Sequence, residues 1–309
     1  MPNPDASTSS YAGEFSGKYI AAALLSASTL DKGLITIMPN VKYKSVLQVG
    51  AYDDIVKDST CSFSGAGTLT LTERVIEPEE FQVNVELCKK DLHASWEAEQ
   101  MGYSAFDNLA PNFEQFVLAQ TAAKVANKIE SNIWEGANAT NGEFAGFSDL
   151  LDADATVVDV TGTTVNSGNV ITEMGKIVDA IPSTVYGKED LFLYVSPSFA
   201  RAYIRALGGY GAQGLGANGI NGQGTTWFTN GALSFDGIPV VVAQGLGANK
   251  AVAAQKSNLF FGTGLMSDHT EVKVIDMADL DGSRNVRVIM RFTAAVQHGI
   301  GSDIVWYRA

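Results

Sequence analysis

One stretch, residues 111–136 with the sequence PNFEQFVLAQTAAKVANKIESNIWEG, constrains the fold of this chain more than any other. A proline at its start and a glycine at its end are typical of helix boundaries. Apolar residues recur at steps of three and four: Phe116, Ala119, Ala123, Ala126, Ile129 and Ile133. At about 1.5 Å per residue the helix would be roughly 37 Å long. The pattern predicts one long, rigid helix with Ile129 in its buried stripe and with Lys128 and Glu130 among the wet positions.

The segments before this helix have the pattern of β-strands. Polar and apolar residues alternate at 68–72 and 81–87, as in strands with one wet face, and further β-forming runs lie at 34–38 and 45–49. A short amphipathic helix is expected at 15–28. Because isolated hairpins are marginal in water, the strands within 41–90 need cover, either from the chain's own core or from a neighbouring subunit.

The second half of the chain alternates strands with helices, which predicts an α/β layer. A strand pair turning at Thr161-Gly162 is expected within 155–165, after a turn-rich connection at 142–151. Helices are expected at 169–181 and 196–207, on either side of the buried strand 191–195. A glycine-rich loop at 208–224 is followed by expected strands at 238–243, 258–262, 269–277, 285–297 and 304–309.

Composition excludes several classes of function. The 21 Lys and Arg against 34 Asp and Glu give a net charge of −13, which argues against a broad nucleic-acid-binding surface. The two cysteines, Cys61 and Cys88, have no CxxC or His partner nearby, so neither a disulfide framework nor a zinc site is indicated. No signal-peptide pattern and no apolar run of about 20 residues is found, so no contact with a membrane is expected.

The candidate catalytic motifs fail on their context. The glycine-rich loop matches G-x-G-x-x-G, but a helix precedes it and no helix follows, unlike a dinucleotide fingerprint. His93, His269 and His298 have no triad spacing, and His298 with Ser302 and Asp303 is a chance cluster. The acidic run Asp276, Asp279 and Asp281 lacks the EF-hand register, so a solvated hairpin tip is expected. No catalytic, cofactor-binding or metal-binding residue is therefore predicted, and the chain is not expected to be an enzyme.

The order of these segments resembles the major capsid proteins of tailed bacteriophages with the HK97-like fold. The segments that carry the resemblance are LITIMPNVKYKSVLQ, TLTLTERVIEPEEFQVNVELCKKDL, the long helix at 111–136, and FDGIPVVVA after the glycine-rich loop. It covers nearly the whole chain but includes no catalytic signature. The fold it implies is α+β, with an N-terminal arm, an extended β-hairpin loop, a peripheral domain with a long spine helix, and an axial α/β domain.

The resemblance also implies domain boundaries. Residues 1–40 correspond to the arm and 41–90 to the extended loop that lies over an adjacent subunit. Residues 91–150 and 267–296 correspond to the peripheral domain, with its spine helix at 111–136. Residues 151–266 and 297–309 correspond to the axial domain, with the glycine-rich loop near a capsomer axis.

The function implied by the resemblance is structural: self-assembly into an icosahedral phage head around double-stranded DNA. The expected partners are copies of the same chain in pentameric and hexameric capsomers, then scaffold, portal and decoration proteins, with only weak, non-specific contact to DNA. The expected location is the virion, after assembly in the bacterial cytoplasm. Three alternatives stay open: an encapsulin shell around an enzyme cargo, an α/β enzyme that binds phosphate with its glycine-rich loop, and a surface-array protein.

Overall fold

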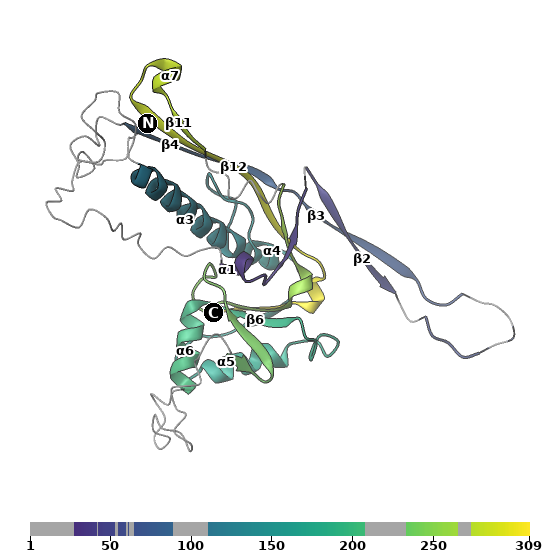
Figure 1. The fold of residues 1–309 in the computed structure, drawn as a ribbon. Coiled ribbons are helices and arrows are strands. Elements are labelled where there is room, and N and C mark those ends of the chain that lie inside the picture. The colour runs from purple at the N-terminus through teal and green to yellow at the C-terminus, as the bar shows by residue number, and fades with distance from the viewer. Residues whose placement is uncertain are drawn as a thin grey trace.

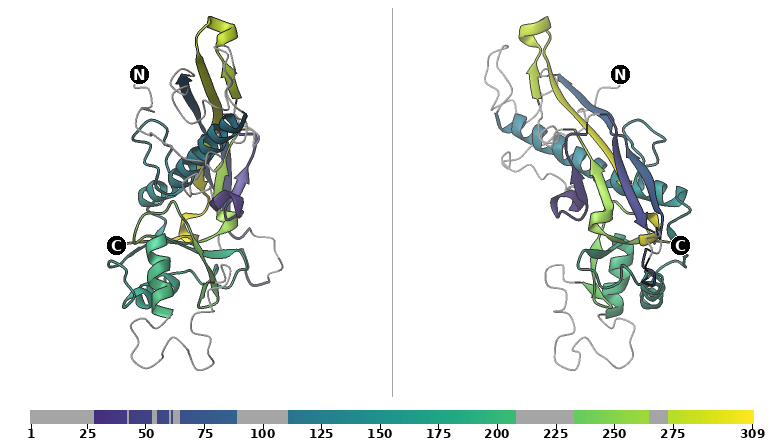
Figure 2. Two further views of the ribbon diagram at one scale, coloured as in Figure 1. Left: turned by 60° about the vertical axis from the view of Figure 1, so that its left-hand side comes forward. Right: turned by 90° about the vertical axis from the view of Figure 1, so that its right-hand side faces the viewer.

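The computed structural model describes residues 28–41, 43–52, 55–59, 61, 65–88, 111–207, 233–264 and 273–309. Their strands form a five-stranded sheet, a six-stranded sheet and a two-stranded hairpin. The two larger sheets belong to one body, and the hairpin projects away from it (Figure 1). Two further views show the long helix above and the two helices of the six-stranded layer below (Figure 2).

The five-stranded sheet is built around its longest strand, β12 (Asn285–His298). Three strands pair with β12 in antiparallel fashion: β4 (Glu79–Cys88), β10 (Leu259–Gly262) and β11 (Lys273–Asp276). Strand β1 (Thr36–Met38) adds to β10 in parallel. The predicted strands at 258–262 and 285–297 are confirmed, and a short helix, α7 (Ala278–Asp281), joins β11 to β12. It ends at Gly282, whose φ of 72° is readily adopted by glycine.

The long helix, α3 (Pro111–Glu135), lies against this sheet and confirms the predicted helix. Ile129 is 5% exposed and Ile133 is fully buried, as the apolar stripe predicts. The expectation that Glu130 is wet is wrong, because its side chain is fully buried. Helix α1 (Ser28–Asp31) covers the side of α3 that carries Glu130. Thr29 of α1 donates to the Glu130 carboxylate from its backbone N–H at 3.0 Å and from its hydroxyl at 2.6 Å. These donors replace water around the buried carboxylate.

The six-stranded sheet runs in the order β5, β13, β9, β6, β8, β7. These strands are β5 (Val158–Thr161), β13 (Val305–Arg308), β9 (Ala251–Gln255), β6 (Leu191–Val195), β8 (Ile238–Val242) and β7 (Ser234–Phe235). Helices α5 (Val170–Asp179) and α6 (Pro197–Leu207) pack on one face, which confirms both predicted helices. The predicted strands at 191–195, 238–243 and 304–309 are likewise confirmed.

Strand β6 is buried on both faces, which explains its uninterrupted apolar sequence. Leu193 faces the core formed with α5 and α6, whereas Tyr194 faces the core formed with α3. The ring of Tyr194 lies 5.3 Å from that of Trp134 on α3, and its hydroxyl donates to the carbonyl of Leu34 at 2.6 Å. The six-stranded sheet therefore contributes side chains to two cores, one on each of its faces.

The projecting hairpin consists of β2 (Ser45–Tyr52) and β3 (Leu69–Ile76). Its antiparallel register runs from Ser45 opposite Ile76 to Tyr52 opposite Leu69. The alternation at 68–72 and 81–87 thus predicts strands correctly. The second of these strands is part of β4, which pairs along its length with β12 in the body.

Two expectations for local structure are wrong. Residues 155–165 contain one strand, β5, because Gly162 donates its N–H to the Arg308 carbonyl and the chain then passes over the ring of Tyr307. The turn-rich connection expected at 142–151 contains helix α4 (Phe147–Ala153), which buries Phe147 and Leu151. The helix expected at 15–28 and the glycine-rich loop at 208–224 lie outside the described residues, apart from Ser28 in α1.

Candidate functional site

The structure describes only some of the residues considered for catalysis. His93, His269 and the side chain of Asp279 lie outside the described residues. His298 is 1% exposed and bonds to Asp154, whereas Ser302 is exposed. Within the described ranges, no group of three or more His, Cys, Asp and Glu side chains could hold a metal ion, and no helix is long and apolar enough to cross a membrane.

The acidic hairpin tip has a structural role in the described residues. The carboxylate of Asp276 accepts the N–H of Ala278, and that of Asp281 accepts the N–H of Ser283. These bonds shape the turns on either side of α7. Cys61 and Cys88 are both free thiols.

The hairpin formed by β2 and β3 exposes apolar side chains on one face. Val46 stands opposite Val75, and Leu71 and Leu69 lie further along the same face, beyond the Gln48–Glu73 pair, because residues two apart in a strand point the same way. Their exposed fractions are 49% for Val46, 43% for Val75, 59% for Leu71 and 45% for Leu69. We call these four side chains the apolar hairpin face. Exposed apolar residues gathered on one surface are typical of a site that contacts another protein.

A groove of about 410 Å³ lies between helix α3 and strands β4 and β12. Its lining is mainly apolar, with Lys124 and Lys128 at α3 among the polar contributors. The apolar lining residues are Phe81, Val83, Val85, Val125, Ile129, Phe144 and Phe292. The ring of Phe81 lies 5.9 Å from that of Phe144 and 5.6 Å from that of Phe292. The groove thus has an aromatic wall, and it lies beside the helix that the sequence singles out.

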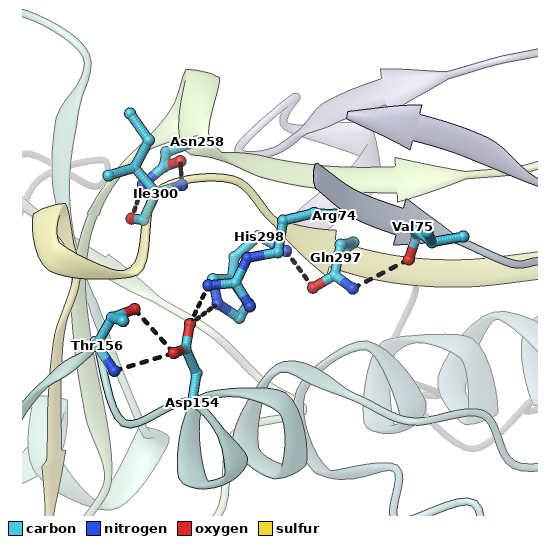
Figure 3. A network of polar contacts seen from close by, with 8 residues as sticks. All are labelled: Arg74, Val75, Asp154, Thr156, Asn258, Gln297, His298 and Ile300. Atoms are coloured by element: carbon cyan, nitrogen blue, oxygen red, sulfur yellow. Dashed lines mark hydrogen bonds and ion pairs between the residues drawn. The ribbon is translucent and has the colours of Figure 1, made fainter. Parts of the chain in front are cut away.

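The base of the hairpin is tied to the body by a cluster of polar residues (Figure 3). Arg74 on β3 donates through Nη2 to Oδ2 of Asp154, the residue that ends α4. The same carboxylate oxygen lies 2.8 Å from Nε2 of His298 at the end of β12. Oδ1 of Asp154 accepts the backbone N–H and the hydroxyl of Thr156, at 2.9 and 2.8 Å. One carboxylate thus connects the hairpin, α4 and β12.

Two further contacts hold the hairpin base. Gln297, next to His298 on β12, donates its side-chain amide to the carbonyl of Val75 at 3.1 Å. Ile76 is fully buried, and a Cβ added at Gly262 would lie 2.9 Å from its side chain. The last residue of β3 is therefore packed into the body, and the polar cluster lies directly beside it.

The surroundings of the cluster lower the pKa of both Asp154 and His298. Burial alone would raise the pKa of Asp154, but hydrogen bonds from His298, Thr156 and Arg74 outweigh it and hold that pKa well below its ordinary value. Burial lowers the pKa of His298, and nearby Arg74 lowers it further, against the opposing effect of Asp154. Asp154 is therefore ionised and His298 neutral at pH 7. Because an ionised carboxylate only accepts hydrogen bonds, Nε2 of His298 carries the proton that it donates.

Sequence patterns do not reveal this cluster. His298 and Asp154 are 144 residues apart, and Arg74 and Asp154 are 80 residues apart. The only local signal is the polar His298 at the end of a long strand, and the expectation that it is a chance neighbour of Ser302 and Asp303 does not reveal its contact with Asp154.

Comparison with protein-family models finds no match, and comparison with curated protein sequences finds none either. Solved structures do match over nearly the whole chain. The capsid asymmetric unit of cyanophage A-1(L) has 14% identity and a TM-score of 0.64, covering 95% of this chain and 96% of that one. The capsid of an empty GTA particle has 12% identity and a TM-score of 0.62, covering 96% and 94%.

A further match is a chain from Mycobacterium phage Adephagia, with 13% identity and a TM-score of 0.57, covering 97% of this chain and 95% of that one. At such low identity the likeness is one of fold. The chain has a mixed α+β fold that it shares with phage and GTA capsid subunits.

Proposed function

We propose that this chain is a major capsid protein, a structural subunit that assembles into an icosahedral phage head around double-stranded DNA. The observation that carries the proposal is the projecting hairpin, whose apolar face is left exposed by the described residues of the body, in a fold shared with capsid subunits. A subunit that must bury such a face on its neighbour is stable in an assembly and incomplete alone.

The groove on α3 is the surface that we assign to the neighbouring copy's hairpin. Its aromatic and aliphatic lining is suited to the apolar hairpin face, with Val46, Val75, Leu69 and Leu71 as the entering side chains. Lys124 and Lys128 among the lining residues would lie near Glu73, which is on the same hairpin face. Repetition of this contact around a ring would generate pentameric and hexameric capsomers.

We further propose the HK97-like division of the chain. The five-stranded sheet with α3 corresponds to the peripheral domain (91–150 and 267–296), and the six-stranded sheet with α5 and α6 to the axial domain (151–266 and 297–309). The arm is 1–40 and the extended loop region 41–90. Within the extended loop region the projecting hairpin spans only 45–76, because β4 pairs with β12 in the five-stranded sheet. Strand β10 lies in the axial segment but also pairs with β12, so it connects the axial segment to the peripheral sheet.

Electron microscopy of the purified chain tests the proposal. We expect closed shells or capsomers, alone or with the phage's scaffold protein. If only small soluble oligomers form under every assembly condition, including with scaffold, the proposal is wrong. Mass spectrometry of isolated shells separates the phage head from the encapsulin alternative, because portal protein with DNA indicates the former and an enzyme cargo the latter. The likeness to phage and GTA capsids favours the phage head.

A further inference from the structure

The cluster at the hairpin base joins the hairpin to the body, next to the Gln297–Val75 hydrogen bond and the buried Ile76. Arg74 belongs to the hairpin, whereas Asp154 and His298 belong to the body. Thr156 donates to the other oxygen of Asp154, so the body itself positions this carboxylate. The guanidinium of Arg74 is the group that the hairpin contributes to the pair. Ile76 anchors the end of β3, and the Arg74–Asp154 pair lies beside this anchor. The pair is thus placed to set the angle of the hairpin without carrying its attachment.

His298 is the member of the cluster that can change charge. Its Nε2 donates to Asp154, and its buried Nδ1 has no hydrogen-bond partner among the described residues. A proton on Nδ1 would create a second cation on a carboxylate that already neutralises Arg74. The charged groups that the structure places against His298 are Arg74 from β3 and Asp154 from α4, and its neighbours Gln297 and Asn258 are uncharged.

The three side chains differ in how easily they reach water. His298 is 1% exposed, Asp154 is 10% exposed and Arg74 is 29% exposed. When two cations compete for one carboxylate, the bond to the more exposed cation breaks first, because its charge is readily solvated. Protonation of His298 would therefore strengthen the His298–Asp154 bond and release Arg74.

We propose that Arg74, Asp154 and His298 form an acid-sensitive latch that fixes the angle of the β2–β3 hairpin, and that a proton on His298 opens it. Opening leaves Ile76 in the core, so the hairpin pivots and stays attached. The lowered pKa of His298 places opening below pH 6.5, the ordinary value, while Asp154 is still ionised. The latch is a property of the single subunit and does not depend on whether the chain forms a shell.

Distance measurements between two spin labels test the latch in the full chain. Cys61 and Cys88 are replaced by Ser, and labels are attached at Thr70→Cys on β3 and Thr172→Cys on α5, both exposed positions. Labelled chain is mixed with excess unlabelled chain, so that only distances within one molecule contribute. We expect a narrow distance distribution at about pH 7.5 that broadens reversibly on titration to about pH 4.5.

Variants of the two cations identify the group responsible. His298→Gln keeps an N–H donor for Asp154 but cannot be protonated, so its distribution should stay narrow across the titration. Arg74→Gln lacks the charge that holds the hairpin, so its distribution should be broad already at about pH 7.5. Lys44→Gln is the matched control, because Lys44 pairs at 2.8 Å with Glu77 at the same end of the hairpin, in an exposed ion pair that does not involve the body.

The latch is rejected if the wild-type distribution does not change with pH, if His298→Gln broadens as the wild type does, or if Arg74→Gln stays narrow at neutral pH. A second label pair within the body, Thr172→Cys with Ser302→Cys, reports on general acid unfolding. If that pair broadens together with the hairpin pair, acid acts on the whole fold and the latch is also rejected. Should His298→Gln fail to fold, His298→Asn takes its place in the titration, because it also offers an N–H donor and cannot be protonated.

Discussion

The apolar hairpin face should control assembly without affecting the fold of the subunit. The test replaces both leucines of this face in one variant, Leu69→Thr with Leu71→Thr. Thr is a good strand former, so the hairpin should persist. Both positions are exposed, at 45% and 59%, so the free energy of unfolding of the subunit should change by about 0.5 kcal/mol or less.

The effect on assembly can be worked from the exposed fractions. Complete burial of a leucine side chain contributes about 1.5–3 kcal/mol, so covering the exposed half of each side chain contributes about 1 kcal/mol. The double variant should therefore weaken each contact between subunits by about 2 kcal/mol, which is roughly 30-fold in the association constant. Because every contact in a ring loses the same amount, the concentration needed for assembly should rise further.

Light scattering against protein concentration, with electron microscopy of the products, measures the assembly threshold, and thermal unfolding of the unassembled subunit measures the fold. The matched control is Ile171→Thr on α5, because Ile171 is 52% exposed but lies far from the hairpin in the sequence and on the six-stranded layer. If the double variant assembles at the wild-type concentration, or if Ile171→Thr impairs assembly equally, the hairpin face is not the contact surface.

Three further predictions concern the stability of the subunit. Ile129→Asp places a charge at a core position that is 5% exposed and should prevent folding. As a control, Lys128→Gln removes only a partly exposed ion pair and should leave thermal unfolding nearly unchanged. A soluble, folded Ile129→Asp subunit would mean that the wrong helix face was assigned. Gly162→Ala places a Cβ 2.0 Å from the hydroxyl of Tyr307 and should destabilise the subunit by about 1–3 kcal/mol in chemical denaturation; an unchanged midpoint would show that the ring moves aside at little cost. Folding lowers the pKa of Asp154, so the stability that this carboxylate contributes is complete above the ordinary pKa of 3.8 and is lost as the pH falls toward the pKa of the folded state. Asp154→Asn should therefore lower the free energy of unfolding at neutral pH and make it depend less on pH in acid. A profile of stability against pH identical to that of the wild type would contradict this.

The local elements are largely predictable because a helix or strand that buries one face carries apolar residues at a regular spacing in the sequence. The stripe through Ile129 and Ile133 places α3 to within one residue, and alternation locates β3 and β4. Period alone cannot say what covers the other face of an element. Glu130 is polar at a wet position of the helical pattern, yet Thr29, about a hundred residues earlier, buries it.

The corrections share this cause. Helix α4 follows glycine-rich residues that read as turns, and it forms because Phe147 and Leu151 fill the core beside Trp134, whose ring lies 5.4 Å from that of Phe147. Residues 155–165 read as a strand pair because Val and Thr favour strands. Only the packing of Gly162 against Tyr307 ends the strand there.

By itself, the sequence determined the long helix at 111–136, most of the strands and helices around it, and a layout that resembles capsid proteins. It also excluded common catalytic motifs, because those motifs require fixed local contexts that are missing. Only the tertiary structure decided which strands project and which join the body, where the groove on α3 lies, and that Asp154 connects Arg74 to His298. The physical reason is that side-chain periodicity reports the face that is buried, whereas pairing between distant segments depends on complementary surfaces that no local pattern encodes.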